Sequence, residues 1–151
     1  MEKKLKILFL CTGNSCRSQM AEGWTRELKG DIIDVYSAGV ESHGLNPNAV
    51  KVMAEAGIDI SGQRSKLITE FVDIELDVVI TVCGHAHETC PYFPPRCKVI
   101  HVGFDDPPQM AEALARQGAD KKKQLDCYRK VRDEIKTFVE KMPDIINNRI
   151  V

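Results

Sequence analysis

The fold is decided by an apolar run that leads into a short polar loop, Lys6-Ile-Leu-Phe-Leu-Cys-Thr-Gly-Asn-Ser-Cys-Arg17. Its first half is continuously β-prone, which is typical of a strand buried on both faces of a sheet. After the loop, apolar residues recur at helical spacing, and Ser18 is expected to cap the helix that they form. The order strand, loop, helix predicts the first unit of an α/β fold.

The rest of the chain alternates between strand and helix patterns. Short β-rich runs occupy residues 35–38, 77–82 and 98–102, and Asn46-Pro47 is typical of a helix start. Residues 125–142 carry the apolar stripe of a long amphipathic closing helix. This alternation predicts a three-layer α/β sandwich in which helices flank a four-stranded parallel sheet. Ligands bind such sheets beyond the carboxyl ends of the strands.

Length and composition predict one domain over residues 1–151. With 21 basic and 22 acidic side chains, the chain has no basic surplus of the kind that binds nucleic acid or an anionic membrane. Its apolar runs are too short to span a bilayer or to form a signal peptide. Six cysteines are too few for a disulfide scaffold. We therefore expect a cytoplasmic monomer whose cysteines are reduced.

The loop after the first strand has the composition of an oxyanion site. Successive backbone N–H groups that open a helix bind anions, and the helix dipole adds positive potential. The same dipole and the Arg17 guanidinium would lower the pKa of Cys11 and make it a thiolate nucleophile. The alternative is a buried cysteine beside a surface arginine, but the position between strand and helix favours a site. The expected anion-binding residues are Thr12, Gly13, Asn14, Ser15, Cys16, Arg17 and Ser18.

A second cysteine pair lies in Cys83-Gly-His-Ala-His-Glu-Thr-Cys90. A phosphatase needs one cysteine, whereas a reductase needs a further thiol to supply two electrons. Cys83 follows the third strand, so it lies on the same sheet edge as Cys11. Two other interpretations remain open from the residues alone: a zinc chelate that adds His85 and His87 to the two thiols, and a surface loop with unpaired cysteines.

A carboxyl group is available in Asp105-Asp106-Pro107. Taken alone, this tripeptide is a plain turn signal. An oxygen of phosphate or arsenate leaves poorly unless it is protonated, and a carboxyl on a proline-stiffened loop could supply that proton. The segment gains a functional interpretation only together with the cysteine loop.

Three segments carry a resemblance to a known family: residues 11–24, Tyr36-Ser-Ala-Gly39 and Phe104-Asp-Asp-Pro107. They resemble the thioredoxin-coupled arsenate reductases, which are built on the low-molecular-weight tyrosine phosphatase fold. The resemblance implies that Cys11 attacks arsenate, that Arg17 clamps the anion and that Asp106, not Asp105, is the general acid.

The resemblance also assigns the second cysteine pair. It implies that Cys83 captures Cys11 and that Cys90 then captures Cys83, which leaves a redox-active Cys83–Cys90 disulfide for thioredoxin or another dithiol to reduce. Phosphate and sulfate are expected as substrate analogues, weak phosphatase activity as a side reaction, and no bound cofactor or metal. The alternatives are a low-molecular-weight protein tyrosine phosphatase, and a zinc-binding or redox-sensing module without turnover. Pro107-Pro108-Gln109 lacks the aromatic residues with which such phosphatases receive a substrate ring.

One position departs from the family pattern. Several relatives hold a potassium ion behind the anion loop with residues that match Asn14, Glu22 and Ser37, and with an aspartate that is replaced here by Lys66. An ammonium carries the same single charge as potassium, so Lys66 could reach Glu22 and take the place of the ion. The alternative is that Lys66 points to solvent.

Overall fold

A four-stranded parallel sheet organises the protein, as the sequence predicts. The computed structural model describes residues 3–84, 86, 93 and 96–150. Within this part of the chain the strand order is β2-β1-β3-β4, and each neighbouring pair is parallel. The strands are β1 (Leu5–Cys11), β2 (Ile33–Gly39), β3 (Val78–Thr81) and β4 (Lys98–His101).

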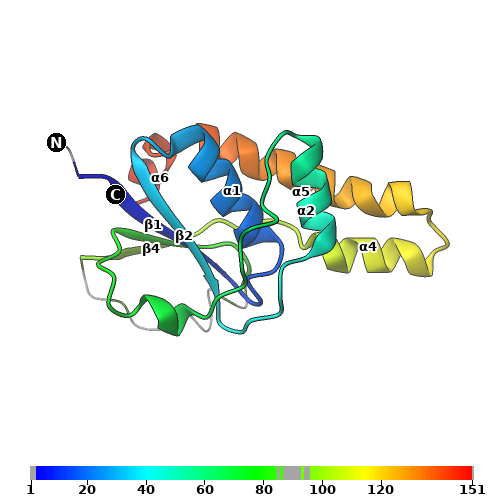
Figure 1. Ribbon diagram of the computed structural model, residues 1–151, viewed down its shortest axis with the longest axis horizontal. Coiled ribbons are helices and arrows are strands. Elements are labelled where there is room, and N and C mark those ends of the chain that lie inside the picture. The colour runs from blue at the N-terminus through cyan, green and yellow to red at the C-terminus, as the bar shows by residue number, and fades with distance from the viewer. Residues whose placement is uncertain (1–2, 85, 87–92, 94–95, 151) are drawn as a thin grey trace.

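Helices flank the sheet and lengthen the molecule at one end. In Figure 1, α1 and α5 lie above the strands with α2 beside them, and the segment around η1 lies below the strands. Helix α4 pairs with the first part of α5 as a hairpin that extends past the sheet (Figure 1). The helices are α1 (Arg17–Lys29), α2 (Pro47–Glu55), the 3-10 helix η1 (Ile68–Phe71), α4 (Pro107–Arg116), α5 (Lys121–Glu140) and α6 (Asp144–Ile150).

Strand β1 is the centre of the core. Residues 7–10 are fully buried, because β1 is hydrogen-bonded to β2 on one side and to β3 on the other and is covered on both faces. The strand ends at Cys11, opposite Gly39 of β2. The loop that follows therefore leaves the sheet at the carboxyl edge of its central strands, where α/β folds place their ligands.

The predicted start of α2 is confirmed, but the predicted cap of α1 is wrong. The Asn46 side chain accepts hydrogen bonds from the backbone N–H groups of Asn48 and Ala49, at 2.8 and 3.3 Å. Helix α1 instead begins after Cys16, which makes no side-chain cap. Ser18 lies inside the first turn, and its hydroxyl group is bonded to side chains of the preceding loop.

Three helices were not expected from the sequence. Helix α4 begins at Pro107, where Asp-Pro was interpreted as a turn; proline at the first helical position suits a helix start equally well. Helix α6 and η1 are short, so they show little periodicity. Among the described residues, none of the helices combines the length and the apolar character needed to cross a membrane.

Candidate active site

The loop of residues 11–17 is held in shape by backbone contacts. Asn14 adopts a left-handed conformation with φ of 48°, which asparagine tolerates better than most residues. The segment after β2 runs alongside the loop: Val40 N–H donates to Cys11 O at 3.2 Å, and Glu41 N–H donates to Thr12 O at 2.8 Å. A Cβ atom on Gly39 would lie 2.7 Å from the Asn14 nitrogen. Glycine is therefore required at position 39 for this close approach.

Cys11 lies at the base of this loop with a hydroxyl partner. Its Sγ atom is buried and lies 2.8 Å from Ser18 Oγ. The Ser18 oxygen in turn accepts a hydrogen bond from Asn14 Nδ2 at 2.9 Å. The Asn14 amide thus donates to the Ser18 oxygen, and the Ser18 hydroxyl is free to donate to the sulfur of Cys11.

Arg17 and Asp106 face each other across the loop. The Arg17 guanidinium donates to the carbonyl oxygen of Phe104 at 3.0 Å and lies 3.6 Å from Asp106 Oδ1. Asp106 precedes α4, yet its carboxylate makes no capping hydrogen bond and stays directed toward Arg17. The Asp105 side chain is 65% exposed, compared with 35% for Asp106, and it lies 3.9 Å from Lys130. Of the two aspartates, Asp106 is therefore the one paired with the anion-clamp candidate Arg17.

The structure places Cys83 next to the same loop. Its Sγ atom is buried, lies 3.2 Å from Thr12 Oγ1 and accepts a hydrogen bond from the Ala86 N–H at 3.3 Å. The contact with Thr12 brings the end of β3 to the residue that follows Cys11. Cys90, His85 and His87 lie outside the described residues. Among the residues that are described, no group of acidic, histidine or cysteine side chains could hold a metal.

Cys16 is the second cysteine of the loop. Burial raises its pKa strongly, the negative charges of Asp106 and Cys11 raise it further, and the positive charge of Arg17 opposes them. Cys16 is therefore a neutral thiol near neutral pH, which separates it chemically from a nucleophile.

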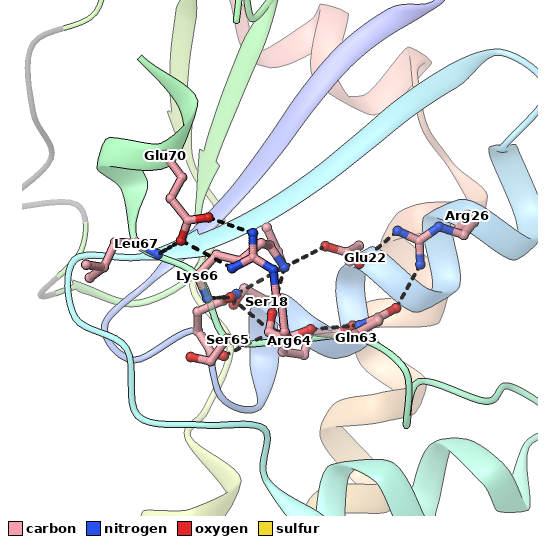
Figure 2. A network of polar contacts seen from close by, with 12 residues as sticks. Ser18, Glu22, Arg26, Gln63, Arg64, Ser65, Lys66, Leu67 and Glu70 are labelled. Atoms are coloured by element: carbon pink, nitrogen blue, oxygen red, sulfur yellow. Dashed lines mark hydrogen bonds and ion pairs between the residues drawn. The ribbon is translucent and has the colours of Figure 1, made fainter. Parts of the chain in front are cut away.

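Asn14, Glu22, Ser37 and Lys66 meet behind the loop. Asn14 Nδ2 donates to Ser37 Oγ at 3.0 Å, and the Ser37 hydroxyl donates to Glu22 Oε1 at 2.8 Å. The Lys66 ammonium lies 3.5 Å from the same Glu22 oxygen and donates to Arg64 O at 2.7 Å. Figure 2 shows the Glu22 carboxylate between Lys66 and Arg26, which binds its second oxygen at 2.8 Å.

Lys66 is largely enclosed in this network. Only 12% of its side chain is exposed. Burial lowers the pKa of its ammonium, while the carboxylate of Glu22 raises it in opposition. The Lys66 ammonium and the Glu22 carboxylate neutralise each other, and either charge would be costly to bury without its partner.

Comparison with known proteins places this arrangement in a family. Residues 6–149 match the family described as low molecular weight phosphotyrosine protein phosphatase. The chain belongs to this family. One relative of this chain is the arsenate reductase of Halalkalibacterium halodurans, which is 54% identical over 144 residues. The match covers 93% of this chain and 98% of that protein.

Solved structures of arsenate reductases are also similar to this chain. An arsenate reductase in the phosphate binding state is 36% identical, with a TM-score of 0.70 and coverage of 96% of this chain and 98% of that one. An arsenate reductase in the oxidized state is 35% identical, with a TM-score of 0.73 and coverage of 93% and 98%. Proteins similar to this chain have thus been seen with bound phosphate and in an oxidised form.

Two contacts of this family member were missed at the level of sequence. Thr12 was expected only to bind an anion, and its contact with Cys83 depends on how closely β1 and β3 approach at their ends. Ser18 was expected to cap α1, whereas its hydroxyl group faces Cys11. The only available signal was that both hydroxyl residues lie within one helical turn of the loop cysteines.

Proposed function

We propose that this chain reduces arsenate to arsenite with Cys11 as the nucleophile and is returned to its reduced form by thioredoxin or another protein dithiol. The observation that carries the proposal is the position of Cys83, whose Sγ atom lies 3.2 Å from Thr12 Oγ1 in the anion loop. Hydrolysis of a phosphate needs no second thiol there, whereas reduction does. The names of the relatives agree with this choice.

In the first step the Cys11 thiolate attacks arsenic and forms a sulfur–arsenic bond. The anion is held by Arg17 and by the residues from Thr12 to Ser18, and the carbonyl group of Phe104 keeps the Arg17 guanidinium turned to the loop. The displaced oxygen leaves as water after Asp106 gives it a proton. The position of Asp106 beside Arg17 supports this role.

In the second step the Cys83 thiolate attacks the sulfur of Cys11. A Cys11–Cys83 disulfide forms, the electron pair of the sulfur–arsenic bond goes to arsenic, and arsenite leaves. Cys90 then attacks Cys83, and Cys11 departs as a thiolate. The resulting Cys83–Cys90 disulfide takes two electrons from the partner dithiol. This cycle needs no bound cofactor.

The network behind the loop gives the Cys11 thiolate a fixed electrostatic environment. We propose that the Lys66 ammonium occupies the position at which related enzymes hold a potassium ion. Its contact with Glu22 and its burial support this assignment. Glu22 is linked through Ser37 and Asn14 to Ser18, which contacts Cys11.

The experiment follows NADPH oxidation in a mixture of the protein, arsenate, thioredoxin and thioredoxin reductase, with each component omitted in turn. Sustained oxidation that requires all four components supports the proposal. NADPH oxidation that continues without arsenate argues against arsenate reduction. Absence of NADPH oxidation in the complete mixture, when arsenite still forms with a small dithiol as the direct reductant, argues against thioredoxin.

A phosphatase is the second candidate, and the family match favours it specifically. Cys11, Arg17 and Asp106 suffice for phosphate ester hydrolysis. Release of phosphate from a small aryl phosphate tests this activity, which we expect to be weak beside arsenate reduction.

A further inference from the structure

Gln19 is a fully buried polar residue for which the steps above have no use. It lies in the first part of α1, directly after Ser18. Buried carboxamides persist only when their hydrogen-bonding groups find partners. The partners of Gln19 therefore show what the residue is positioned to do.

The amide nitrogen of Gln19 faces three oxygen atoms. Gln19 Nε2 lies 3.1 Å from Asn14 O, 3.0 Å from Asn14 Oδ1 and 2.9 Å from Arg64 O. All three oxygens can only accept, so they fix which end of the carboxamide is the NH₂ group. Two of them belong to the residue with left-handed backbone in the anion loop.

The other end of the carboxamide is held by Gln63. Gln63 Nε2 donates to Gln19 Oε1 at 2.7 Å and to Gln19 O at 3.1 Å. The remaining oxygen of Gln63 accepts from Arg26 at 2.9 Å, the contact visible beside the label of Gln63 in Figure 2. Gln63 and Arg26, which lie outside the loop of residues 11–17, thus fix the orientation of the Gln19 carboxamide.

Asn14 is the residue through which this contact can reach the nucleophile. Its Oδ1 also accepts from Lys66 N–H at 2.7 Å, so the side chain cannot turn over, and its Nδ2 donates to Ser18 Oγ at 2.9 Å. Ser18 Oγ lies 2.8 Å from Cys11 Sγ. A change at Gln19 that releases Asn14 would move the group that aims Ser18 at the sulfur.

From these contacts we propose that Gln19 is a positioning residue of the anion loop. Its carboxamide holds Asn14 in the left-handed conformation and thereby sets both the reactivity of Cys11 and the shape of the anion site. The proposal deepens the function given above and rests on it for the role of the loop. The side-chain hydrogen bonds of Gln19 go to Asn14, Arg64 and Gln63, and of these residues Asn14 is the one that leads to Cys11.

The test compares Gln19→Met with Thr25→Val in the otherwise unchanged protein. Methionine keeps the length and volume of glutamine but has no amide donor. Thr25 is also fully buried on α1, and its hydroxyl group donates at 2.7 Å to Ala21 O within the helix, away from the loop. Gln19→Met loses the four hydrogen bonds of the carboxamide and Thr25→Val loses one, but only Gln19→Met changes the support of Asn14.

Two measurements that use neither arsenate nor thioredoxin distinguish this proposal from the proposed function. The first is the pH midpoint of Cys11 alkylation by iodoacetamide, with the site of labelling located by peptide mass mapping. The second is the Kd of inorganic phosphate measured by calorimetry. In Gln19→Met we expect the midpoint to rise by about one pH unit and the Kd to rise about tenfold. In Thr25→Val we expect the midpoint to move by less than about 0.3 pH unit and the Kd to change less than about twofold.

A folded Gln19→Met protein with the midpoint and Kd of the unchanged chain overturns the proposal, as does an equal shift in Thr25→Val. Should Gln19→Met fail to fold, Gln63→Met decides. That variant leaves the Gln19 carboxamide in place but removes the donor that orients it. We expect the pH midpoint of Cys11 alkylation to rise by about 0.5 pH unit and the Kd of phosphate to rise about threefold. No shift in Gln63→Met overturns the proposal.

Discussion

Thr12 Oγ1 lies 3.2 Å from Cys83 Sγ, and this contact joins the residue after the proposed nucleophile Cys11 to the segment that follows β3. Cys11 ends β1, and Cys83 lies two residues beyond the end of β3, which is the parallel neighbour of β1 in the sheet. The second thiol therefore lies beside the anion loop. A two-electron reduction can then proceed by thiol exchange over a short path.

Replacing Cys83 should separate reduction from hydrolysis. We expect Cys83→Ser to lose arsenate reduction, by at least about a thousandfold, because a serine hydroxyl cannot form the disulfide. Hydrolysis of a small aryl phosphate should persist, since it needs only Cys11, Arg17 and Asp106. Parallel assays of both activities give the answer.

The matched control for Cys83→Ser is Cys127→Ser. Cys127 is a buried cysteine on α5, and its Sγ atom donates a hydrogen bond to the carbonyl group of Lys123 at 3.7 Å within the same helix. Both activities should survive there. Equal loss of reduction and hydrolysis in Cys83→Ser would assign Cys83 a structural role instead.

The two neighbouring aspartates should differ sharply. We expect Asp106→Asn to lower kcat for arsenate about a hundredfold, because a general acid acts in the transition state, with little change in phosphate affinity. Asp105→Asn is the control, because this exposed side chain faces Lys130 rather than Arg17. Steady-state kinetics of both variants make the comparison, and a larger loss in Asp105→Asn would reverse the assignment.

Alkylation should discriminate between the two cysteines of the loop. Burial raises the pKa of Cys16, and the negative charges of Asp106 and Cys11 raise it further. Its thiolate should therefore be scarce at about pH 7 and should stay scarce through the pH range in which ordinary thiols ionise. Iodoacetamide should therefore modify Cys11 first across that range. Peptide mapping that finds Cys16 labelled as fast as Cys11 would show that burial does not protect it.

Potassium should have little effect on this protein. If the Lys66 ammonium fills the ion position beside Glu22, exchanging potassium for a bulky organic cation at constant ionic strength should change activity and Tm little. Lys66→Asp should create potassium dependence, because it restores a carboxylate and empties the position. Activity titrated against potassium in both proteins tests this, and clear activation of the unmutated chain would rule out the replacement.

Much of the fold was predictable because its signals are local. Three such signals are the continuous apolar run of β1, the Asn46-Pro47 helix start and the apolar stripe of α5. Each can be read from one short stretch of neighbouring residues. The alternation of strands and helices predicts that the strands are parallel, but it does not specify the order β2-β1-β3-β4. Helix α4 was missed because Asp106-Pro107 suits a turn and a helix start equally well.

The side-chain partners of the site were harder to predict. Serine is a residue type that often caps helices, but α1 begins at Arg17, two residues earlier than a cap at Ser18 would require. The Ser18 hydroxyl group therefore lies inside the helix and faces Cys11. Lys66 meets Glu22 only because its segment runs beside Gly39 at the end of β2. Periodicity and turn signals carry no information on contacts that depend on how distant segments pack.

The central claim is that Cys83 attacks the arsenic adduct of Cys11, and one variant tests it most directly. Cys90→Ser keeps the attacking thiol but removes the thiol that would resolve the bridge. After a single turnover with arsenate, followed by acid quenching and peptide mapping, we expect a Cys11–Cys83 disulfide together with one equivalent of arsenite. A Cys11–Cys16 disulfide, or arsenite released with Cys83 still reduced, would contradict the account.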